Sequence, residues 1–213
     1  MTTQQDYVYS IYGKNVTIPI VQTYDENIGS CVWASGQVMA DYIASKSTFF
    51  SGKHILELGC GPGLSGIVAA KVGARVYLTD KDNPETLLKT CEMNCIINNI
   101  YESCSIFSLN WGHFASNMCQ IPALDWIIGS DIFYDSKLFD DLLCTLSYYF
   151  SVFPKLQTLF VIQERVSLYC LKKHIKKWNF DYRFEQVEQS ILDKYKANET
   201  LLYLYISKCN TSF

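Results

Sequence analysis

Three closely spaced glycines carry the strongest chemical signal in the sequence. Gly59, Gly61 and Gly63 follow the apolar segment 54–58 and precede a stretch of small and apolar residues at 64–72. Glycine allows a tight turn and leaves room for a ligand to approach the backbone. A strand, a glycine turn and a helix in this order bind nucleotides beyond the carboxyl end of the strand. The pattern therefore predicts a nucleotide-binding turn.

Other nucleotide motifs compete with this interpretation. Gly61, Gly63 and Gly66 give a shifted match to the Gly-x-Gly-x-x-Gly pattern, so a nicotinamide oxidoreductase is an alternative. A phosphate loop is excluded, because no Gly-Lys-Ser/Thr sequence follows the glycines. A cofactor-binding titration separates the remaining two possibilities.

Two carboxylates accompany the glycines. Glu57 interrupts an apolar strand, where a carboxylate is costly unless it is hydrogen-bonded or paired. It can hold the glycine turn or contact a ligand ammonium group, and both roles stay open. Asp80 ends the next predicted strand, where an acidic side chain can accept hydrogen bonds from both ribose hydroxyls of an adenosine. A strand-end or helix-capping role is the alternative for Asp80.

The elements that must position these residues follow from hydrophobic periodicity and turn signals. Alternating residues around Gly13-Lys14-Asn15 predict an N-terminal β-hairpin, and residues 32–45 predict an amphipathic helix. After Gly52, strands and helices alternate. Strands are predicted at 54–58, 75–79, 104–109, 124–129, 156–162, 180–187 and 201–206, and helices at 64–72, 84–98, 138–150 and 166–178.

Repeated strand–helix units predict an α/β fold with a Rossmann-like, mostly parallel sheet of seven strands and helices on both faces. The last two strands have no predicted helix between them, so they should form an antiparallel ribbon with an antiparallel last strand. No linker or repeat divides the chain. We therefore expect one domain over residues 1–213, in which the hairpin and helix of residues 1–50 extend a core at residues 51–213.

Composition excludes several classes of protein. Of the 213 residues 49% are hydrophobic, which is enough for a substantial core and excludes disorder. The net charge of −3 argues against a nucleic-acid partner, and no apolar run is long enough for a membrane helix. The nine cysteines are scattered, and Cys91 and Cys95 are expected to be small buried or half-buried side chains on a helix. With no signal peptide at the N-terminus, a reduced intracellular protein without a metal site is expected.

From about Trp33 to Ile206 the chain resembles the class I S-adenosylmethionine-dependent methyltransferases, and among them the methyltransferase-like group that modifies proteins on lysine or arginine. The matching segments are Glu57-Leu58-Gly59-Cys60-Gly61, Asp80, Met93-Asn94 with Asn98-Asn99, Leu109-Asn110-Trp111-Gly112, Ser130-Asp131-Ile132-Phe133-Tyr134 and Trp33. Two residues depart from the family pattern: Cys60 replaces a small alanine in the loop, and Ala34 replaces a proline after the tryptophan.

The resemblance implies a site for S-adenosyl-L-methionine and no metal. The residues implied in cofactor binding are Trp33, Glu57, Gly59, Cys60, Gly61, Asp80, Trp111 and Ser130, and those implied in catalysis are Asp131 and Tyr134. His113 is expected to be structural or solvent-facing. The basic segment 172–177 is expected to be a solvated helix face.

The activity that the resemblance implies is protein N-methylation. The preferred acceptor is an arginine of a histone, and a protein lysine is the alternative. An arginine acceptor needs carboxylates, for which Asp131, Asp135 and Glu164 are candidates, whereas a lysine acceptor suits an aromatic channel formed by Phe133 and Tyr134. A small-molecule methyltransferase and a non-catalytic, chaperone-associated regulator are further alternatives. The expected partner is a protein substrate such as histone H3 or a chaperone, and the expected enzyme is a cytoplasmic and nuclear monomer.

Overall fold

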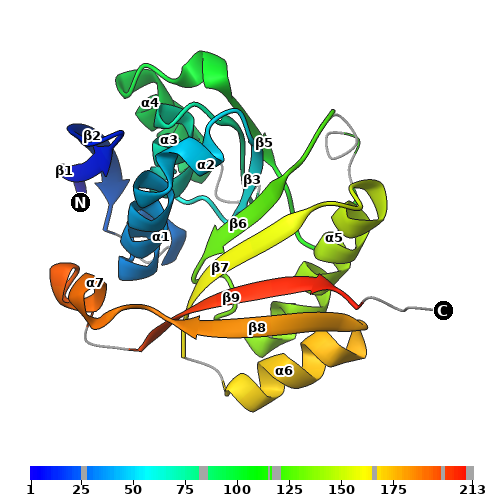
Figure 1. Cartoon of the computed structure of the whole chain (residues 1–213). Helices are drawn as coiled ribbons and strands as arrows, with labels where there is room; N and C mark the ends of the chain where they lie inside the picture. Colours follow the sequence, from blue (N-terminus) through cyan, green and yellow to red (C-terminus); the bar gives the residue numbers. More distant parts are fainter. Residues whose placement is uncertain are drawn as a thin grey trace.

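Seven strands form the central sheet of the computed structural model, which describes residues 1–24, 28–81, 86–114, 116, 121–164, 167–197 and 200–209. In spatial order they are β5 (Cys104–Ser108), β4 (Arg75–Asp80), β3 (His54–Leu58), β6 (Trp126–Ser130), β7 (Gln157–Gln163), β9 (Leu201–Lys208) and β8 (Phe180–Gln186). The first five strands run parallel, and β9 is antiparallel to both β7 and β8 (Figure 1). The predicted α/β fold with its antiparallel last strand is confirmed.

Helices cover both faces of this sheet (Figure 1). One face packs against α1 (Ala34–Ser45), α3 (Leu64–Lys71) and α4 (Thr86–Ile97), and the other against α5 (Phe139–Val152) and α6 (Leu168–Lys177). Neighbouring strand residues alternate between the two cores: Ile55 lies in the first and Leu56 in the second. Because both faces are buried, the central strands are continuous apolar runs, which is typical of parallel sheets.

The connection between β8 and β9 differs from the prediction. It contains the short helix α7 (Gln189–Lys194), where the sequence predicted none. Its six residues carry only two apolar side chains, Ile191 and Leu192, which pack against the first core. That is too little periodicity to reveal a helix from sequence. A four-residue helix, α2 (Ser47–Phe50), follows α1, and Pro84 lies outside the described residues.

The N-terminal hairpin consists of β1 (Thr2–Ile11) and β2 (Lys14–Thr23) and forms its own two-stranded sheet. Ile11 pairs with Lys14, so the turn is Tyr12-Gly13 and lies one residue earlier than predicted. Both turn residues have positive φ, 51° and 75°, as a two-residue hairpin turn of the primed type requires. Tyr7, Tyr9 and Ile11 belong to the core shared with α1 and α3.

Within the described residues, no helix is long and apolar enough to cross a membrane. Cys91 and Cys95 are fully buried in α4, as predicted.

Candidate active site

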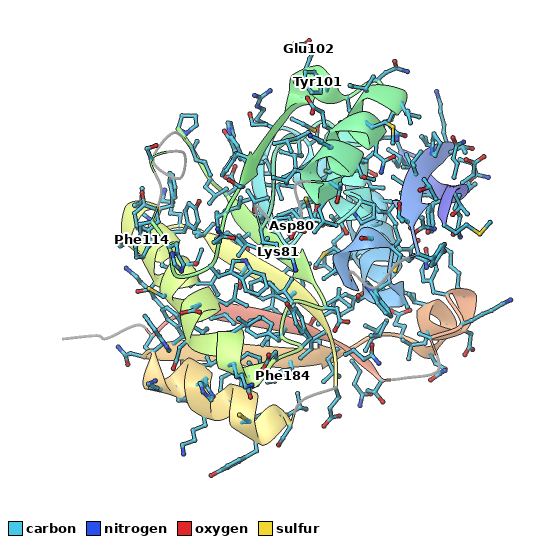
Figure 2. The ribbon with its side chains drawn as sticks, turned by 180° about the vertical axis from the view of Figure 1, so that it is seen from behind. Asp80, Lys81, Tyr101, Glu102, Phe114 and Phe184 are labelled. Atoms are coloured by element: carbon cyan, nitrogen blue, oxygen red, sulfur yellow. The ribbon has the colours of Figure 1, made fainter. Side chains whose placement is uncertain are left out.

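A cleft of about 590 Å³ lies at the carboxyl ends of the parallel strands. Its walls come from the segment around Gly29–Gly36, the loops after β3, β4, β5 and β6, and the first turns of α1 and α3. Asp80 and Lys81, which contribute to it, lie near the centre of the view in Figure 2. All ten predicted site residues line this cleft, namely Trp33, Glu57, Gly59, Cys60, Gly61, Asp80, Trp111, Ser130, Asp131 and Tyr134.

The glycine loop is shaped by close contacts with two other segments. Gly59 and Gly61 have φ angles of 67° and 50°. A Cβ atom on Gly61 would lie 2.7 Å from the carbonyl oxygen of Gly29, and one on Gly59 would lie 2.8 Å from Cγ2 of Ile132. Any side chain at either position would therefore push the cleft walls apart.

Cys60 sits between these glycines without obstructing the cleft. Its backbone N–H donates to the Thr79 carbonyl at 2.9 Å, and its Sγ lies 3.8 Å from Sγ of Cys91 in α4. The thiol therefore packs toward the helix, which explains why this departure from the family pattern can be accommodated.

Asp80 fixes the loop through its carboxylate. Oδ2 accepts a hydrogen bond from the Gly61 N–H at 2.8 Å, and Oδ1 accepts one from the Lys81 N–H at 2.8 Å. Each carboxylate oxygen keeps a second lone pair, so the group can still accept from a pair of sugar hydroxyls. Burial raises the pKa of Asp80 above its usual value, and the two backbone hydrogen bonds oppose that rise.

Glu57 is buried beneath the loop and anchors the helix that follows. Its Oε2 accepts a hydrogen bond from the Gly66 N–H in the first turn of α3 at 2.9 Å. Burial raises its pKa to about 8, although the bond to Gly66 lowers it. The side chain is therefore mainly protonated at neutral pH, which favours the anchoring role over that of a counter-ion for a ligand ammonium group.

Ser130 and Asp131 form the wall at the end of β6. Asp131 has a φ of 57°, a left-handed conformation uncommon for a residue other than glycine, and its N–H donates to the Val161 carbonyl at 2.8 Å. The Ser130 hydroxyl is buried and has no hydrogen-bond partner among the described residues. Strained backbone and an unpaired buried hydroxyl side by side are features of binding sites.

Aromatic side chains border the cleft. Trp33 precedes the first turn of α1 and is 40% exposed, and Tyr134 is 37% exposed. Burial and the nearby carboxylates of Asp80, Asp135 and Asp131 raise the pKa of Tyr134. Trp111 follows β5, and a Cβ atom on Gly59 would lie 3.6 Å from its Cζ2, so the indole lies against the glycine loop.

Several residues predicted near the site lie elsewhere. Phe133 does not line a channel, because it is buried against Phe139 and Phe160 in the second core. Asp135 accepts a hydrogen bond from the Lys137 N–H at 2.9 Å and does not line the cleft, and neither does Glu164. His113, predicted to be structural or solvent-facing, is exposed at the rim of the cleft.

Other cleft residues were missed by sequence reasoning. Gly29, Ser35, Asn110 and Asp141 all line it. Ser35 is in the first turn of α1, and its hydroxyl is buried without a hydrogen-bond partner among the described residues. A serine near a helix start is ordinary in sequence, so no local signal marks it. Asp141, in the first turn of α5, packs against Gly112, where a Cβ atom would lie 2.9 Å from its Oδ1.

These features fit an adenosyl-sulfonium cofactor. The glycine loop admits a ligand at the backbone, Asp80 offers acceptors for sugar hydroxyls, and the buried Ser35 and Ser130 hydroxyls each need a partner. Trp111 offers an aromatic face. Across the described part of the chain, no group of three or more His, Cys, Asp or Glu residues is arranged to hold a metal ion.

Comparison with known proteins identifies the family. Residues 13–178 match the family described as lysine methyltransferase. The histone-arginine methyltransferase METTL23 of Homo sapiens is 32% identical over 171 residues, which cover 80% of this chain and 90% of the relative. Its Mus musculus counterpart is 30% identical over 206 residues, covering 92% and 80%. The protein N-lysine methyltransferase METTL21A of Xenopus tropicalis is 33% identical over 132 residues, covering 62% and 60%.

Solved structures share the fold at low sequence identity. The glycopeptide N-methyltransferase MtfA complexed with sinefungin superposes with a TM-score of 0.61 at 11% identity, covering 87% of this chain and 90% of that one. The METTL16 methyltransferase domain gives 0.60 at 10% identity, covering 88% and 73%. The predicted resemblance to the methyltransferase-like group that modifies proteins on lysine or arginine is confirmed. The chain therefore belongs to the lysine methyltransferase family and is a class I S-adenosylmethionine-dependent protein methyltransferase.

Proposed function

We propose that this enzyme methylates arginine side chains of a protein substrate, histones foremost. The relatives named as histone-arginine methyltransferases support this, because they align along at least 80% of both chains in mouse and human. The observation that carries the proposal is the placement of Asp131. Its backbone has a positive φ and is held by the hydrogen bond from its N–H to the Val161 carbonyl. Asp131 also lines the same cleft as Asp80.

The cofactor side of the cleft would be held by this chain's loop and its anchors. Asp80 would accept the sugar hydroxyls, Ser35 and Ser130 would donate to polar groups of the ligand, and Trp111 would face the base. Bound there, S-adenosyl-L-methionine supplies a methyl group already activated by the adjacent sulfonium. The task left to the protein is to align the acceptor and exclude water.

The acceptor side would be built around Asp131 and Tyr134. A guanidinium group is always protonated outside an enzyme site, so a carboxylate must bind it and hold its charge away from the attacking nitrogen. Asp131 is suited to that contact because it lines the cleft. Tyr134 would close the mouth around the aliphatic part of the acceptor.

Lysine is the second candidate acceptor. The matching family is described as lysine methyltransferase, and METTL21A is a named lysine enzyme of similar identity over a shorter span. The ammonium group must lose a proton before it attacks, and an apolar, aromatic mouth favours the neutral amine. Trp33 and Tyr134 offer such a surface, whereas Phe133 does not, because it is buried.

Radiolabelled methyl transfer tests the assignment. The protein is incubated with S-adenosyl-L-methionine labelled in the methyl group and with purified histone H3, other core histones or a chaperone, and the modified residue is identified after acid hydrolysis. We expect labelled methylarginine. Recovery of methyllysine alone would replace the arginine proposal by the lysine one.

A matched pair of variants tests the role of Asp131. Asp131→Asn should lower kcat/KM at least tenfold with unchanged affinity for S-adenosylhomocysteine, since a charge-assisted hydrogen bond contributes about 1.5–3 kcal/mol. Asp135→Asn should leave both unchanged, because Asp135 lies outside the cleft and Asn caps a turn equally well. Equal activity in the two variants would remove Asp131 from the acceptor site.

We also propose that the enzyme is a monomer located in cytoplasm and nucleus. Light scattering should then give a mass near 24.4 kDa. Fractionation of cells that produce the protein should recover it from both compartments.

A further inference from the structure

The second strand of the N-terminal hairpin is linked by side-chain hydrogen bonds to both walls of the cofactor cleft. One wall is the glycine loop at residues 59–63, and the other is the segment at residues 29–36 that leads into α1. The two walls meet closely, because a Cβ atom on Gly61 would lie 2.7 Å from the Gly29 carbonyl oxygen. Two consecutive residues of β2, Val21 and Gln22, are hydrogen-bonded toward opposite walls.

Asn94 of α4 joins β2 to the glycine loop. Its Oδ1 accepts a hydrogen bond from the Val21 N–H at 2.8 Å, and its Nδ2 donates to the Val21 carbonyl and the Pro62 carbonyl, each at 2.9 Å. The side chain is fully buried. It therefore bonds the hairpin edge as a neighbouring strand would and uses its remaining donor on the loop.

Gln22 joins β2 to the other wall. Its Oε1 accepts a hydrogen bond from the Val32 N–H at 2.8 Å, and its Nε2 donates to Gln5 Oε1 at 2.9 Å and to the Tyr24 hydroxyl at 3.0 Å. It too is fully buried. Val32 lines the cleft and directly precedes Trp33, so this bond holds the middle of that wall in place.

We propose that Asn94 and Gln22 are positioning residues for the cofactor, and that the hairpin sets the spacing between the two cleft walls. The inference rests on the cofactor cleft described above but not on the identity of the methyl acceptor. Neither side chain lines the cleft, so each acts through backbone that does. A ligand in contact with both walls then binds to a preorganised site, which lowers the cost of ordering them on binding.

Asn98 provides a matched control. It lies four residues after Asn94, just past the end of α4, is also buried, and donates from Nδ2 to the Pro19 carbonyl of the same hairpin strand at 2.8 Å. It makes no hydrogen bond to the glycine loop. Loss of either amide loosens the hairpin, but only loss of Asn94 releases Pro62.

Isothermal titration of S-adenosylhomocysteine tests the proposal without a protein substrate. We expect Asn94→Ala to raise Kd about tenfold, because the Pro62 carbonyl loses a buried hydrogen bond that holds the glycine loop, and Asn98→Ala to raise Kd less than twofold. Equal increases in Kd for the two variants would overturn the proposal, because hairpin stability alone would then explain both. Wild-type protein that bound no S-adenosylhomocysteine would instead overturn the cofactor assignment itself.

Gln22 gives a second test that does not depend on the folding of the Asn94 variant. Gln22→Glu keeps an oxygen that can accept from the Val32 N–H, whereas Gln22→Leu does not. We expect Gln22→Leu to raise Kd about fivefold and Gln22→Glu to stay within twofold of wild type at acidic pH, where the buried acid is neutral. Equal affinity of the two variants would contradict a positioning role, since Gln22→Leu loses the hydrogen bond to the Val32 N–H in the cleft wall and Gln22→Glu keeps it.

Discussion

Two depressions at opposite ends of the parallel strands differ more in chemistry than in size. The cofactor cleft of about 590 Å³ lies where the parallel strands end. A larger depression of about 770 Å³ includes Trp126 and Gln157, the first residues of β6 and β7, together with the hairpin turn and the end of α1. None of the ten predicted site residues lines this second depression.

Several side chains of the larger depression already have partners. The Tyr12 hydroxyl donates to the Val72 carbonyl at 2.6 Å, Arg183 pairs with Glu185 at 2.6 Å, and the Lys46 ammonium lies 5.0 Å from the centre of the Tyr42 ring. The cofactor cleft instead contains two buried hydroxyls, those of Ser35 and Ser130, that have no hydrogen-bond partner within the described part of the chain. Volume therefore does not locate the site, whereas unsatisfied polar groups at converging strand ends do.

Removal of the Asp80 carboxylate from the cofactor cleft should give the largest loss of affinity for S-adenosylhomocysteine. Asp80→Ala deletes the acceptor for sugar hydroxyls and leaves the Gly61 N–H without its partner. Each charge-assisted hydrogen bond contributes about 1.5–3 kcal/mol, so we expect Kd for S-adenosylhomocysteine to rise about a hundredfold. A titration showing Kd within threefold of wild type would remove Asp80 from the site.

Ser130→Ala should raise Kd for S-adenosylhomocysteine less than Asp80→Ala does, and it should not destabilise the protein. The substitution removes a buried hydroxyl that has no partner in the described protein, so the free energy of unfolding should stay equal or increase. If the hydroxyl bonds the cofactor, Kd should nevertheless rise about fivefold, equivalent to about 1 kcal/mol. Denaturant unfolding and titration measure the two quantities separately, and a fall in stability with unchanged Kd would contradict the assignment.

The buried acid Glu57 should make stability depend on pH. Its pKa is raised to about 8 in the folded protein from 4.5, so the folded state holds a proton that the unfolded state loses as pH rises. The free energy of unfolding should therefore fall between about pH 5 and pH 8, by up to about 1.4 kcal/mol per pH unit. Glu57→Gln should remove this dependence on pH. If the free energies of unfolding measured in urea changed with pH equally in wild type and variant, the raised pKa would be refuted.

Arg183→Ala in the larger depression should give the smallest effect. The pair with Glu185 is mostly exposed, so its loss should change the free energy of unfolding by less than about 1 kcal/mol. Affinity for S-adenosylhomocysteine should not change, because Arg183 is not a cleft residue. A marked loss of affinity would mean that the two depressions are coupled, and the contrast between them would fail.

Most of the fold was predictable because its signals are local. The strand at 54–58 is where the apolar run and flanking Gly52 and Gly59 predicted it, and the glycine loop follows directly. The failures also have local causes. The α7 helix is short and polar, and Phe133 points into the second core because the chain turns at Asp131. A change of backbone direction at one residue cannot be recognised from a sequence motif.

The sequence by itself determined the strand–glycine turn–helix unit and the acidic residue that ends the neighbouring strand. It could do so because a right-handed parallel unit brings those two strand ends together wherever it forms. Only the tertiary structure decided that Gly29 closes against Gly61, that Asn94 joins β2 to Pro62, and that the Ser35 and Ser130 hydroxyls lack partners among the residues that the structure describes. These contacts join residues far apart in the chain, and no local propensity encodes which of them will meet.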